Sequence, residues 1–102
     1  MSRPPRMGAA WALERLAADG AQGWRAVEGR DAIKKTFRFG NFVAAFGWMA
    51  QIALVAERMD HHPEWFNVYD RVEATLSTHD AEGVTELDLD LARAMERAAG
   101  GS

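Results

Sequence analysis

Apolar residues recur along the chain with two spacings, and each change of spacing marks the boundary of a predicted element. Intervals of three and four residues indicate helices, and alternation of apolar and polar residues indicates strands buried on one side. In chain order these patterns predict a helix over residues 8–19, strands over 24–27 and 32–39, a helix over 42–60, strands over 65–68 and 71–77, and a last helix from 85 to about 99. Strands this close in sequence favour an antiparallel sheet with the helices on one face. We therefore expect an α+β domain with the order α-β-β-α-β-β-α.

The predicted central helix, residues 42–60, is apolar around nearly its whole circumference. Phe42 and Phe46 lie on one side of it, and Trp48 and Ile52 lie on another. A helix of this kind is buried on more than one side, and the sheet of so small a domain covers only one. We therefore expect a symmetric homo-oligomer, a homodimer or a homotetramer, that pairs sheets or stacks these helices. The apolar run is shorter than the roughly 20 residues that span a bilayer, so we expect no membrane role.

Composition narrows the classes of function. The chain has 102 residues, no cysteine and a net charge of −3. This length suits one domain, residues 1–102, and Pro4 and Pro5 predict that residues 1–6 are loose. The absence of cysteine excludes a disulfide framework, a cysteine nucleophile and an iron–sulfur site. The negative charge disfavours direct binding of nucleic acid, and the lack of a recognisable secretion signal favours the cytoplasm.

All three histidines of the chain lie in one segment. His61 and His62 follow the predicted central helix, and His79 follows a predicted strand. Histidine gives and takes protons near neutral pH, and a nearby carboxylate can fix its tautomer and stabilise its charged form. Carboxylates occur close by at Glu57, Asp60, Asp80 and Asp88. The segment therefore has the composition of an acid–base site, although Asp88 also fits a simple helix cap and each histidine could be structural.

A metal site is the main chemical alternative. Three histidines and a carboxylate would suit zinc. However, the adjacent His61 and His62 cannot easily both turn to one ion, and no His-x-x-x-His pair is present. Nucleophile motifs, glycine-rich phosphate loops and dinucleotide fingerprints are also absent. We therefore expect neither a metal nor a resident cofactor.

The His-His-Pro sequence at residues 61–63 and its surroundings resemble the pterin-4a-carbinolamine dehydratase family. The family pattern is an acidic residue, three further residues, His-His-Pro, an aromatic residue, a distant histidine and then an aspartate. Its positions are filled in order by Glu57, His61, His62, Pro63, Tyr69, His79 and Asp88. The similarity extends over about residues 23–92, including Gly23-Trp24 and the segment 76–79, which makes the match specific.

This resemblance implies a fold, a reaction and a site. The fold is a two-layer α+β sandwich with a four-stranded antiparallel sheet and three helices on one face. The reaction of this hydro-lyase is loss of water from a 4a-hydroxytetrahydropterin to give the quinonoid dihydropterin, which recycles tetrahydrobiopterin after aromatic amino-acid hydroxylases have used it. The implied site has His61, His62 and His79 as catalytic residues, Asp60, Ser77, Thr78 and Asp80 as substrate-binding residues, and Glu57 and Asp88 as supporting carboxylates. The pterin is the substrate, so no cofactor is implied, and the assignment of acid and base among the histidines stays open.

Animal members of the family are tetramers and also act as dimerisation cofactors of a homeodomain transcription factor. This second role keeps open an alternative function, that of an interaction protein of the transcriptional coactivator type with a secondary or vestigial enzyme site. The three histidines argue against this alternative, because a scaffold needs none of them. Nothing in the residues themselves indicates a transcription-factor partner.

Overall fold

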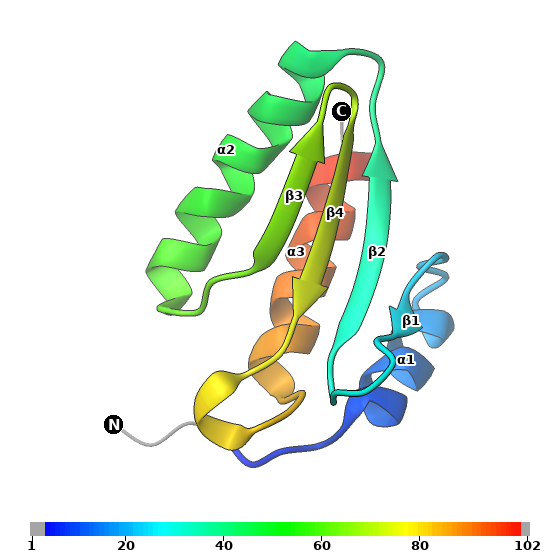
Figure 1. The fold of residues 1–102 in the computed structure, drawn as a ribbon, viewed down its shortest axis with the longest axis vertical. Coiled ribbons are helices and arrows are strands. Elements are labelled where there is room, and N and C mark those ends of the chain that lie inside the picture. The colour runs from blue at the N-terminus through cyan, green and yellow to red at the C-terminus, as the bar shows by residue number, and fades with distance from the viewer. Residues whose placement is uncertain (1–3, 101–102) are drawn as a thin grey trace.

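The elements follow one another along the chain in the predicted order (Figure 1). The structure, a computed structural model, describes residues 4–100. Its elements are α1 (Ala9–Ala18), β1 (Arg25–Ala26), β2 (Ile33–Arg38), α2 (Phe42–Met59), β3 (Glu64–Val68), β4 (Arg71–Leu76), the 3-10 helix η1 (His79–Ala81) and α3 (Glu86–Gly100). Residues 4–8 have no regular secondary structure, and residues 1–3 of the segment expected to be loose lie outside the described residues.

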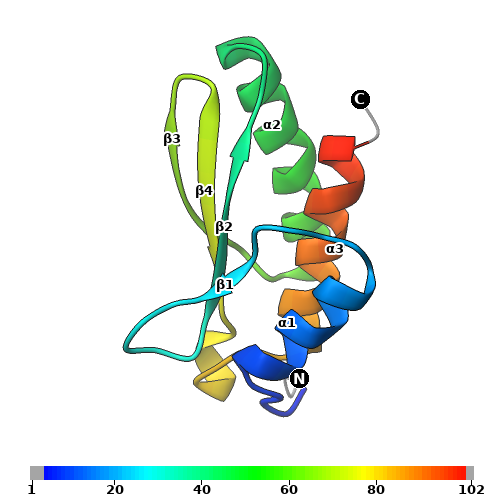
Figure 2. The same ribbon diagram turned by 90° about the vertical axis from the view of Figure 1, so that its right-hand side faces the viewer.

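The four strands form one antiparallel sheet with the order β1-β2-β4-β3. The two hairpins are therefore joined through the central pair β2–β4, in which Phe37 pairs with Val72. On the other side of β4, Ala74 pairs with Trp65 of β3. The three α-helices cover one face of this sheet, so the molecule has two layers (Figure 2). The predicted two-layer α+β sandwich is confirmed.

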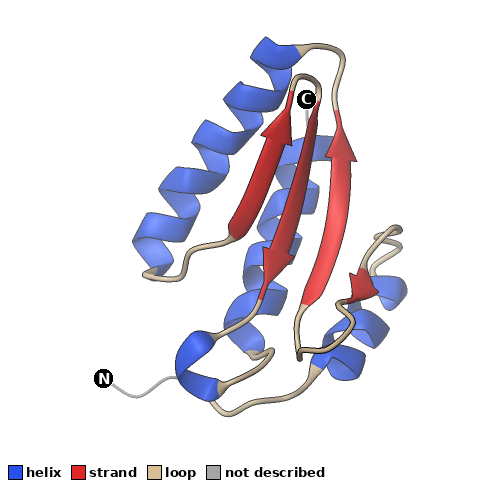
Figure 3. Ribbon diagram, viewed as in Figure 1, coloured by secondary structure: helices blue, strands red, loops and turns tan. Residues whose placement is uncertain are grey.

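Two predicted segments differ from the structure in extent (Figure 3). The first strand was expected over residues 24–27, but only Arg25 and Ala26 enter the ladder. The indole Nε1 of Trp24 instead donates to a carboxylate oxygen of Glu96 in α3 at 2.8 Å, so this residue joins the sheet to a helix. The second difference lies between the predicted strand over residues 71–77 and the predicted helix from residue 85, where the 3-10 helix η1 is an additional element.

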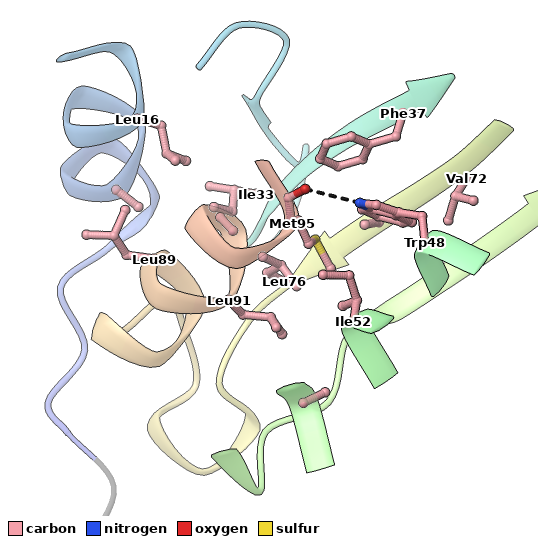
Figure 4. Close-up of a cluster of buried hydrophobic side chains, with 14 of the residues drawn as sticks. Leu16, Ile33, Phe37, Trp48, Ile52, Val72, Leu76, Leu89, Leu91 and Met95 are labelled. Atoms are coloured by element: carbon pink, nitrogen blue, oxygen red, sulfur yellow. Dashed lines mark hydrogen bonds between the residues drawn. The ribbon is translucent and has the colours of Figure 1, made fainter. Parts of the chain in front are cut away.

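The hydrophobic core lies between the sheet and the helices (Figure 4). Trp48 of α2 packs against Phe37 of β2, with ring centroids 4.6 Å apart. Its buried Nε1 donates to the main-chain oxygen of Met95 in α3 at 3.1 Å. This bond satisfies the polar atom of the indole and joins α2 to α3, and an unpaired buried donor would cost about 1–3 kcal/mol.

The buried side of α3 is wider than predicted. The helical spacing of apolar residues from Leu87 predicts an inner row of Leu87, Leu91, Met95 and Ala98. Leu91 and Met95 are buried, whereas Leu87 and Ala98 are only half-buried. Leu89, Ala92 and Ala94 are buried in addition, because α3 packs between α1 and α2 and needs apolar residues on both sides.

One side of α2 stays uncovered in the single chain. Ala45, Trp48, Ile52 and Ala56 form its buried stripe, as expected for a helix with one side on the sheet. The outer face of α2 consists of Phe42, Val43, Phe46 and Leu54, whose exposed fractions range from 47% to 78%. Among the described helices, only α2 has the length and apolar composition that a membrane-spanning helix needs. The core helices of globular proteins can have the same length and composition. Four of the 18 residues of α2 are buried in the single chain.

We predict that the outer face of α2 is covered by a second copy of the chain. Clustered apolar side chains of this size are unusual on a soluble monomer. Light scattering at micromolar concentration is expected to give a homodimer or homotetramer. Phe46→Glu, a change at an exposed position, is expected to reduce the assembly, whereas Ala17→Glu on the exposed side of α1 adds the same charge and serves as control. A monomeric wild-type protein would contradict this prediction.

Candidate active site

The end of α2 and the end of β4 lie at the same end of the sheet (Figure 1) and border a cavity of about 230 Å³. The cavity is lined by Asp60, His61, His62, Ser77, Thr78, His79 and Asp80. These are all of the residues that the sequence predicted as catalytic or substrate-binding. The two predicted supporting carboxylates, Glu57 and Asp88, each contact one of the histidines.

A left-handed residue, Asp60, ends α2 immediately before the two adjacent histidines. Asp60 follows α2 with φ 52°, and the amide of His61 donates to the carbonyl of Ala56 at 3.0 Å. A left-handed residue at this place ends a helix by turning the chain back over its last turn. As a result His61 is 6% exposed, whereas the side chain of His62 is 57% exposed. One imidazole reaches the cavity from the protein interior and the other from the solvent side.

Asp88, in the first turn of α3, is fully buried and bonded on both oxygens. Its Oδ1 lies 2.6 Å from Nε2 of His61, and its Oδ2 accepts from the hydroxyl of Thr78 at 2.7 Å. Oδ2 also accepts from the main-chain N–H of Thr85 at 2.9 Å, which is the bond that the acidic residue of a capping box makes. The same carboxylate therefore caps α3 and holds His61 in place.

When Asp88 is ionised, the hydrogen bonds of this network determine which atom of each pair is the donor. The N–H of Leu87 donates to Oγ1 of Thr85, whose hydroxyl can then donate to Oγ1 of Thr78, 2.7 Å away. The hydroxyl of Thr78 in turn donates to Asp88, and the carboxylate accepts the hydrogen on Nε2 of His61. In neutral His61 the other ring nitrogen, Nδ1, is then a proton acceptor, and after protonation it is a donor.

The other two histidines are held less tightly. Nε2 of His62 lies 2.8 Å from Oε1 of Glu57, an exposed residue in the last turn of α2. His79 is exposed at the start of η1, and its imidazole has no hydrogen bond or ion pair to another residue between 4 and 100. Both ring nitrogens of His79 can therefore contact a ligand.

Tyr69, which fills the aromatic position of the family pattern, lies away from the histidines. It follows β3 at the hairpin turn, whereas His62 and Pro63 precede the first residue of β3. Its φ of 49° places it in the left-handed region, and its side chain is 61% exposed. In the single chain Tyr69 does not line the cavity of the histidines.

Two polar contacts beside the cavity were not predicted. Arg30, in the turn before β2, forms a two-bond ion pair with Glu64 at the start of β3, with N–O distances of 2.8 and 2.7 Å. Asp31 accepts from the hydroxyl of Ser77 through its main-chain oxygen at 2.9 Å, which orients a wall residue of the cavity. The two residues of each pair lie more than 30 positions apart in the sequence. A local sequence pattern therefore does not predict either contact.

The Arg30–Glu64 pair predicts a small dependence of stability on pH. The hydrogen bond from the Arg30 guanidinium lowers the pKa of the Glu64 carboxyl below its ordinary value of 4.5. A lowered pKa contributes stability above the ordinary value, and this contribution is lost as the pH falls through the lowered pKa. Both side chains are substantially exposed, so we expect Glu64→Gln to cost less than about 1 kcal/mol at neutral pH and nothing in strong acid. Urea titrations of both proteins at several pH values check this, and a constant difference would contradict it.

No shared metal site is evident in the part of the chain that the structure describes. Among residues 4–100, no group of three or more histidine, aspartate and glutamate side chains lies close enough to hold one metal ion. Two of the three histidines instead use a ring nitrogen to contact a carboxylate. The arrangement is suited to moving protons.

Comparisons with known proteins agree with the fold and with the sequence pattern. The sequence model of the family Pterin 4 alpha carbinolamine dehydratase matches residues 7–98. A relative from Jannaschia sp. (strain CCS1) is 65% identical over 77 residues, which are 76% of this chain and 79% of the relative. A relative from Rhizobium etli is 56% identical over 91 residues, which are 85% of this chain and 90% of the relative. Both relatives are named, provisionally, as pterin-4-alpha-carbinolamine dehydratases.

Solved structures match over most of the chain. A crystal structure from Brucella melitensis, described as a transcriptional coactivator/pterin dehydratase, has 53% identity, a TM-score of 0.85 and coverage of 93% of this chain and 99% of its own. A pterin dehydratase-like protein described as a RuBisCO assembly factor in the alpha-carboxysome has 22% identity and a TM-score of 0.68, covers 79% of this chain and 94% of its own, and shares the fold alone. With a family model over nearly its whole length and relatives above half identity, the chain belongs to the pterin 4 alpha carbinolamine dehydratase family.

Proposed function

We propose that this protein removes water from 4a-hydroxytetrahydropterins to give the quinonoid dihydropterin, with histidines as acid and base. The observation that supports this most directly is the meeting of three imidazoles at one cavity, two of them bonded to carboxylates. Membership of the dehydratase family supports the same reaction. In this proposal the product is reduced again to the tetrahydropterin, so the reaction belongs to the recycling of tetrahydrobiopterin in the cytoplasm.

The reaction needs two proton transfers and no change of oxidation state. The hydroxyl on C4a must receive a proton so that it leaves as water, and the proton on the adjacent N5 must be removed. The electron pair of that N–H bond then forms the new double bond between N5 and C4a. A positioned acid or base typically contributes about 10²–10⁴-fold to such a step. Imidazoles can perform both transfers near neutral pH.

The contacts suggest different tasks for the wall residues. His61, fixed by Asp88, has Nδ1 available as acceptor or donor, and the carboxylate compensates the positive charge that the ring gains. His62 and His79 are exposed and can meet the substrate from the open side. We propose Asp60, Ser77 and Asp80 as substrate contacts. Thr78 also lines the cavity, but its hydroxyl donates to Asp88, so we propose for Thr78 a supporting role together with Glu57 and Asp88.

A dehydration assay of the purified full chain tests the proposal. The substrate is generated in situ by a separately purified aromatic amino-acid hydroxylase, and formation of the quinonoid dihydropterin is followed with and without the protein. We expect acceleration well above the spontaneous rate. Loss of the acceleration in a triple alanine variant of the histidines assigns it to this site. An absence of acceleration by a folded wild-type protein would exclude the proposed enzyme activity.

We predict that the activity survives removal of metal ions. Proton transfer alone suffices for this elimination, and residues 4–100 offer no closed ligand set. Full activity is therefore expected after exhaustive treatment with EDTA, with elemental analysis to check that metal has been removed. Loss of activity with EDTA and its recovery with zinc would overturn the assignment of the histidines as acid–base groups.

A second candidate function is an interaction protein of the coactivator type. The outer face of α2 favours it, because Phe42, Val43, Phe46 and Leu54 present an apolar surface in the single chain. The structure from Brucella melitensis, whose description names both roles, also favours it. In that case a partner contacts α2, and the alanine variants of the histidines bind this partner as well as the wild type does. A protein without dehydratase activity that keeps an intact α2 surface would favour this second function.

A further inference from the structure

The position of the His79 imidazole depends on the loop that carries it. The ring has no hydrogen bond or ion pair to another residue between 4 and 100. Residues 78–83, which we call the His79 loop, close on themselves between β4 and α3. The N–H of Thr78 donates to the carbonyl of Gly83 at 2.8 Å, and the N–H of Gly83 donates to the carbonyl of Thr78 at 3.2 Å. The place of His79 at the cavity therefore depends on what holds this loop to the rest of the fold.

Asp31, in the turn before β2, holds the chain at both ends of the His79 loop. Its main-chain oxygen accepts from the hydroxyl of Ser77, the residue before the loop, at 2.9 Å. Its Oδ2 accepts from the main-chain N–H of Val84, the residue after the loop, at 2.9 Å. Its Oδ1 accepts from the N–H of Ala9, the first residue of α1, at 2.8 Å. One residue thus connects the His79 loop to β2 and to α1.

The side chains of Asp31 and Arg6 pack closely against the loop at Gly83. A Cβ on Gly83 would overlap Oδ2 of Asp31 and also Cγ and Cδ of Arg6. The guanidinium of Arg6 donates to the main-chain oxygen of Glu82 at 3.4 Å, so Arg6 also binds the loop from this side. This bond is long and Arg6 is exposed. Asp31, which is half-buried and bonded on both carboxylate oxygens, is therefore the more rigid of the two supports.

The network of Asp88 holds the His79 loop from the protein interior. The hydroxyl of Thr78 donates to Asp88 at 2.7 Å, and the same carboxylate contacts His61. A change in this network therefore affects His61 and the loop together. None of the hydrogen bonds of Asp31 involves His61 or Asp88. A change at Asp31 can thus act on His79 while the surroundings of His61 stay intact.

We propose that Asp31 is a positioning residue that acts through His79 and keeps its imidazole at the reacting atoms of the pterin. This inference rests on the proposed dehydratase function. An acid or base must lie about 2.6–3.2 Å from the atom with which it exchanges a proton, and a displacement of about 1 Å can cost about 10²-fold in rate. Without the carboxylate of Asp31, the N–H of Val84 loses its acceptor and the loop can move at that end. The ring of His79 is then outside this range for part of the time, which lowers kcat.

Asp31→Ala tests the inference, because it removes both side-chain bonds and keeps the main-chain bond to Ser77. We expect kcat for dehydration to fall about tenfold and KM to change less than about twofold, since the loss concerns the position of a reacting group. Gly83→Ala separates the loop from Asp31 from the other side and should lower kcat in the same way. Wild-type kcat in Asp31→Ala, or in Gly83→Ala where Asp31→Ala does not fold, would overturn the inference.

A control must separate this effect from the loss of a helix cap. Gly8, the N-cap residue of α1, makes no side-chain cap bond, and Asp31 accepts the N–H of Ala9 in its place. Asn41→Ala removes a comparable bond, that to the N–H of Ala44 at 2.8 Å, at the start of α2 and outside the cavity. We expect Asn41→Ala to lower the urea midpoint, as loss of a cap does, and to keep the wild-type kcat. An equal decrease of kcat in Asn41→Ala would assign the effect to general loosening and contradict the inference.

Two measurements without turnover keep the inference separate from the dehydratase function. In hydrogen exchange, the amides of Thr78 and Gly83 should exchange at least about tenfold faster in Asp31→Ala and at the wild-type rate in Asn41→Ala. Ring nitrogen chemical shifts are recorded while a stable 7,8-dihydropterin is added, and the response of His79 should shrink in Asp31→Ala while that of His61 is kept. Unchanged exchange and unchanged His79 shifts in a folded Asp31→Ala would show that Asp31 does not position His79. If the wild type shows no dehydration, the dehydratase function fails, and these two measurements still decide whether Asp31 positions His79.

Discussion

Alanine in place of His61, His62 or His79 is expected to lower kcat/KM for dehydration by at least tenfold, about 1.4 kcal/mol of transition-state stabilisation for each. The three imidazoles line one cavity, and the reaction needs both a donor and an acceptor of protons. The decreases in kcat/KM should not be additive, because the three groups act together on one substrate and loss of one proton transfer already slows the whole reaction. The double variants are therefore expected to be only slightly worse than the worse single variant.

The environments of the three side chains predict different effects on folding. His62 and His79 are exposed, so their alanine variants should unfold at the same urea concentration as the wild type. His61 is buried and bonded to Asp88, so His61→Ala leaves a buried carboxylate oxygen without its donor and should cost about 1–3 kcal/mol. Glu73→Ala, on the exposed face of the sheet, serves as control for both measurements. Three variants that keep full activity would show that the cluster is structural and that the proposed enzyme function is wrong.

Much of the fold was predictable because local signals agree with the long-range packing. Asn41 precedes the apolar run of α2, and its side chain accepts from the amide of Ala44 at 2.8 Å, as a helix cap should. At the other end, Pro63 prevents the helix from continuing, and α2 ends at Met59. The alternation along β4 was equally informative, since Val72, Ala74 and Leu76 are all buried. At these positions the sequence pattern and the tertiary structure favour the same conformation.

The differences arise where a distant partner decides the local structure. Trp24 sits beside the two-residue strand β1 because Glu96, 72 positions away, accepts its indole N–H. The same carboxylate oxygen also binds Lys35 of β2. The local spacing of residues predicts neither the Trp24–Glu96 contact nor the Lys35–Glu96 contact. The buried side of α3 was likewise underestimated, since its width depends on both neighbouring helices. Single-sequence periodicity describes one element at a time and contains no information on such contacts.

The candidate site was predicted from two kinds of signal. The chemistry of the residues indicated a histidine cluster with carboxylates, but it left Asp88 open between a helix cap and a supporting group. The structure gives Asp88 both contacts at once. Ser77 and Thr78 entered only through the family resemblance, because a serine and a threonine after a strand have no chemical signature of their own. The Arg30–Glu64 pair was not foreseen by either signal.

Replacement of Asp88 is expected to have the largest combined effect on stability and activity. Asp88→Asn keeps the shape of the side chain but exchanges one acceptor oxygen for an NH₂ donor. If the NH₂ group takes the place of Oδ2, it meets the donors of Thr78 and Thr85, and if it takes the place of Oδ1, it meets the hydrogen on Nε2 of His61. Neither orientation satisfies all three partners while the hydrogen stays on Nε2 of His61, so the replacement forces either an unsatisfied buried group or a change of tautomer. Because an unsatisfied buried polar group and the loss of charge-assisted hydrogen bonds each cost about 1–3 kcal/mol, we expect a decrease of that order in the free energy of unfolding.

The activity of Asp88→Asn should fall at least about tenfold, because His61 loses the group that fixes its tautomer. Nitrogen chemical shifts of the His61 ring distinguish this cause from general loosening, since the hydrogen should move from Nε2 to Nδ1 in a protein that is still folded. Asp90→Asn, an exposed neighbour in the same helix, is the matched control and should change stability by no more than about 0.5 kcal/mol. If Asp88→Asn matches Asp90→Asn in urea midpoint and kcat/KM, the buried network has no role in either folding or catalysis. A normal rate with lowered stability would instead confine Asp88 to the helix cap, and His61 would then have to act without a fixed tautomer.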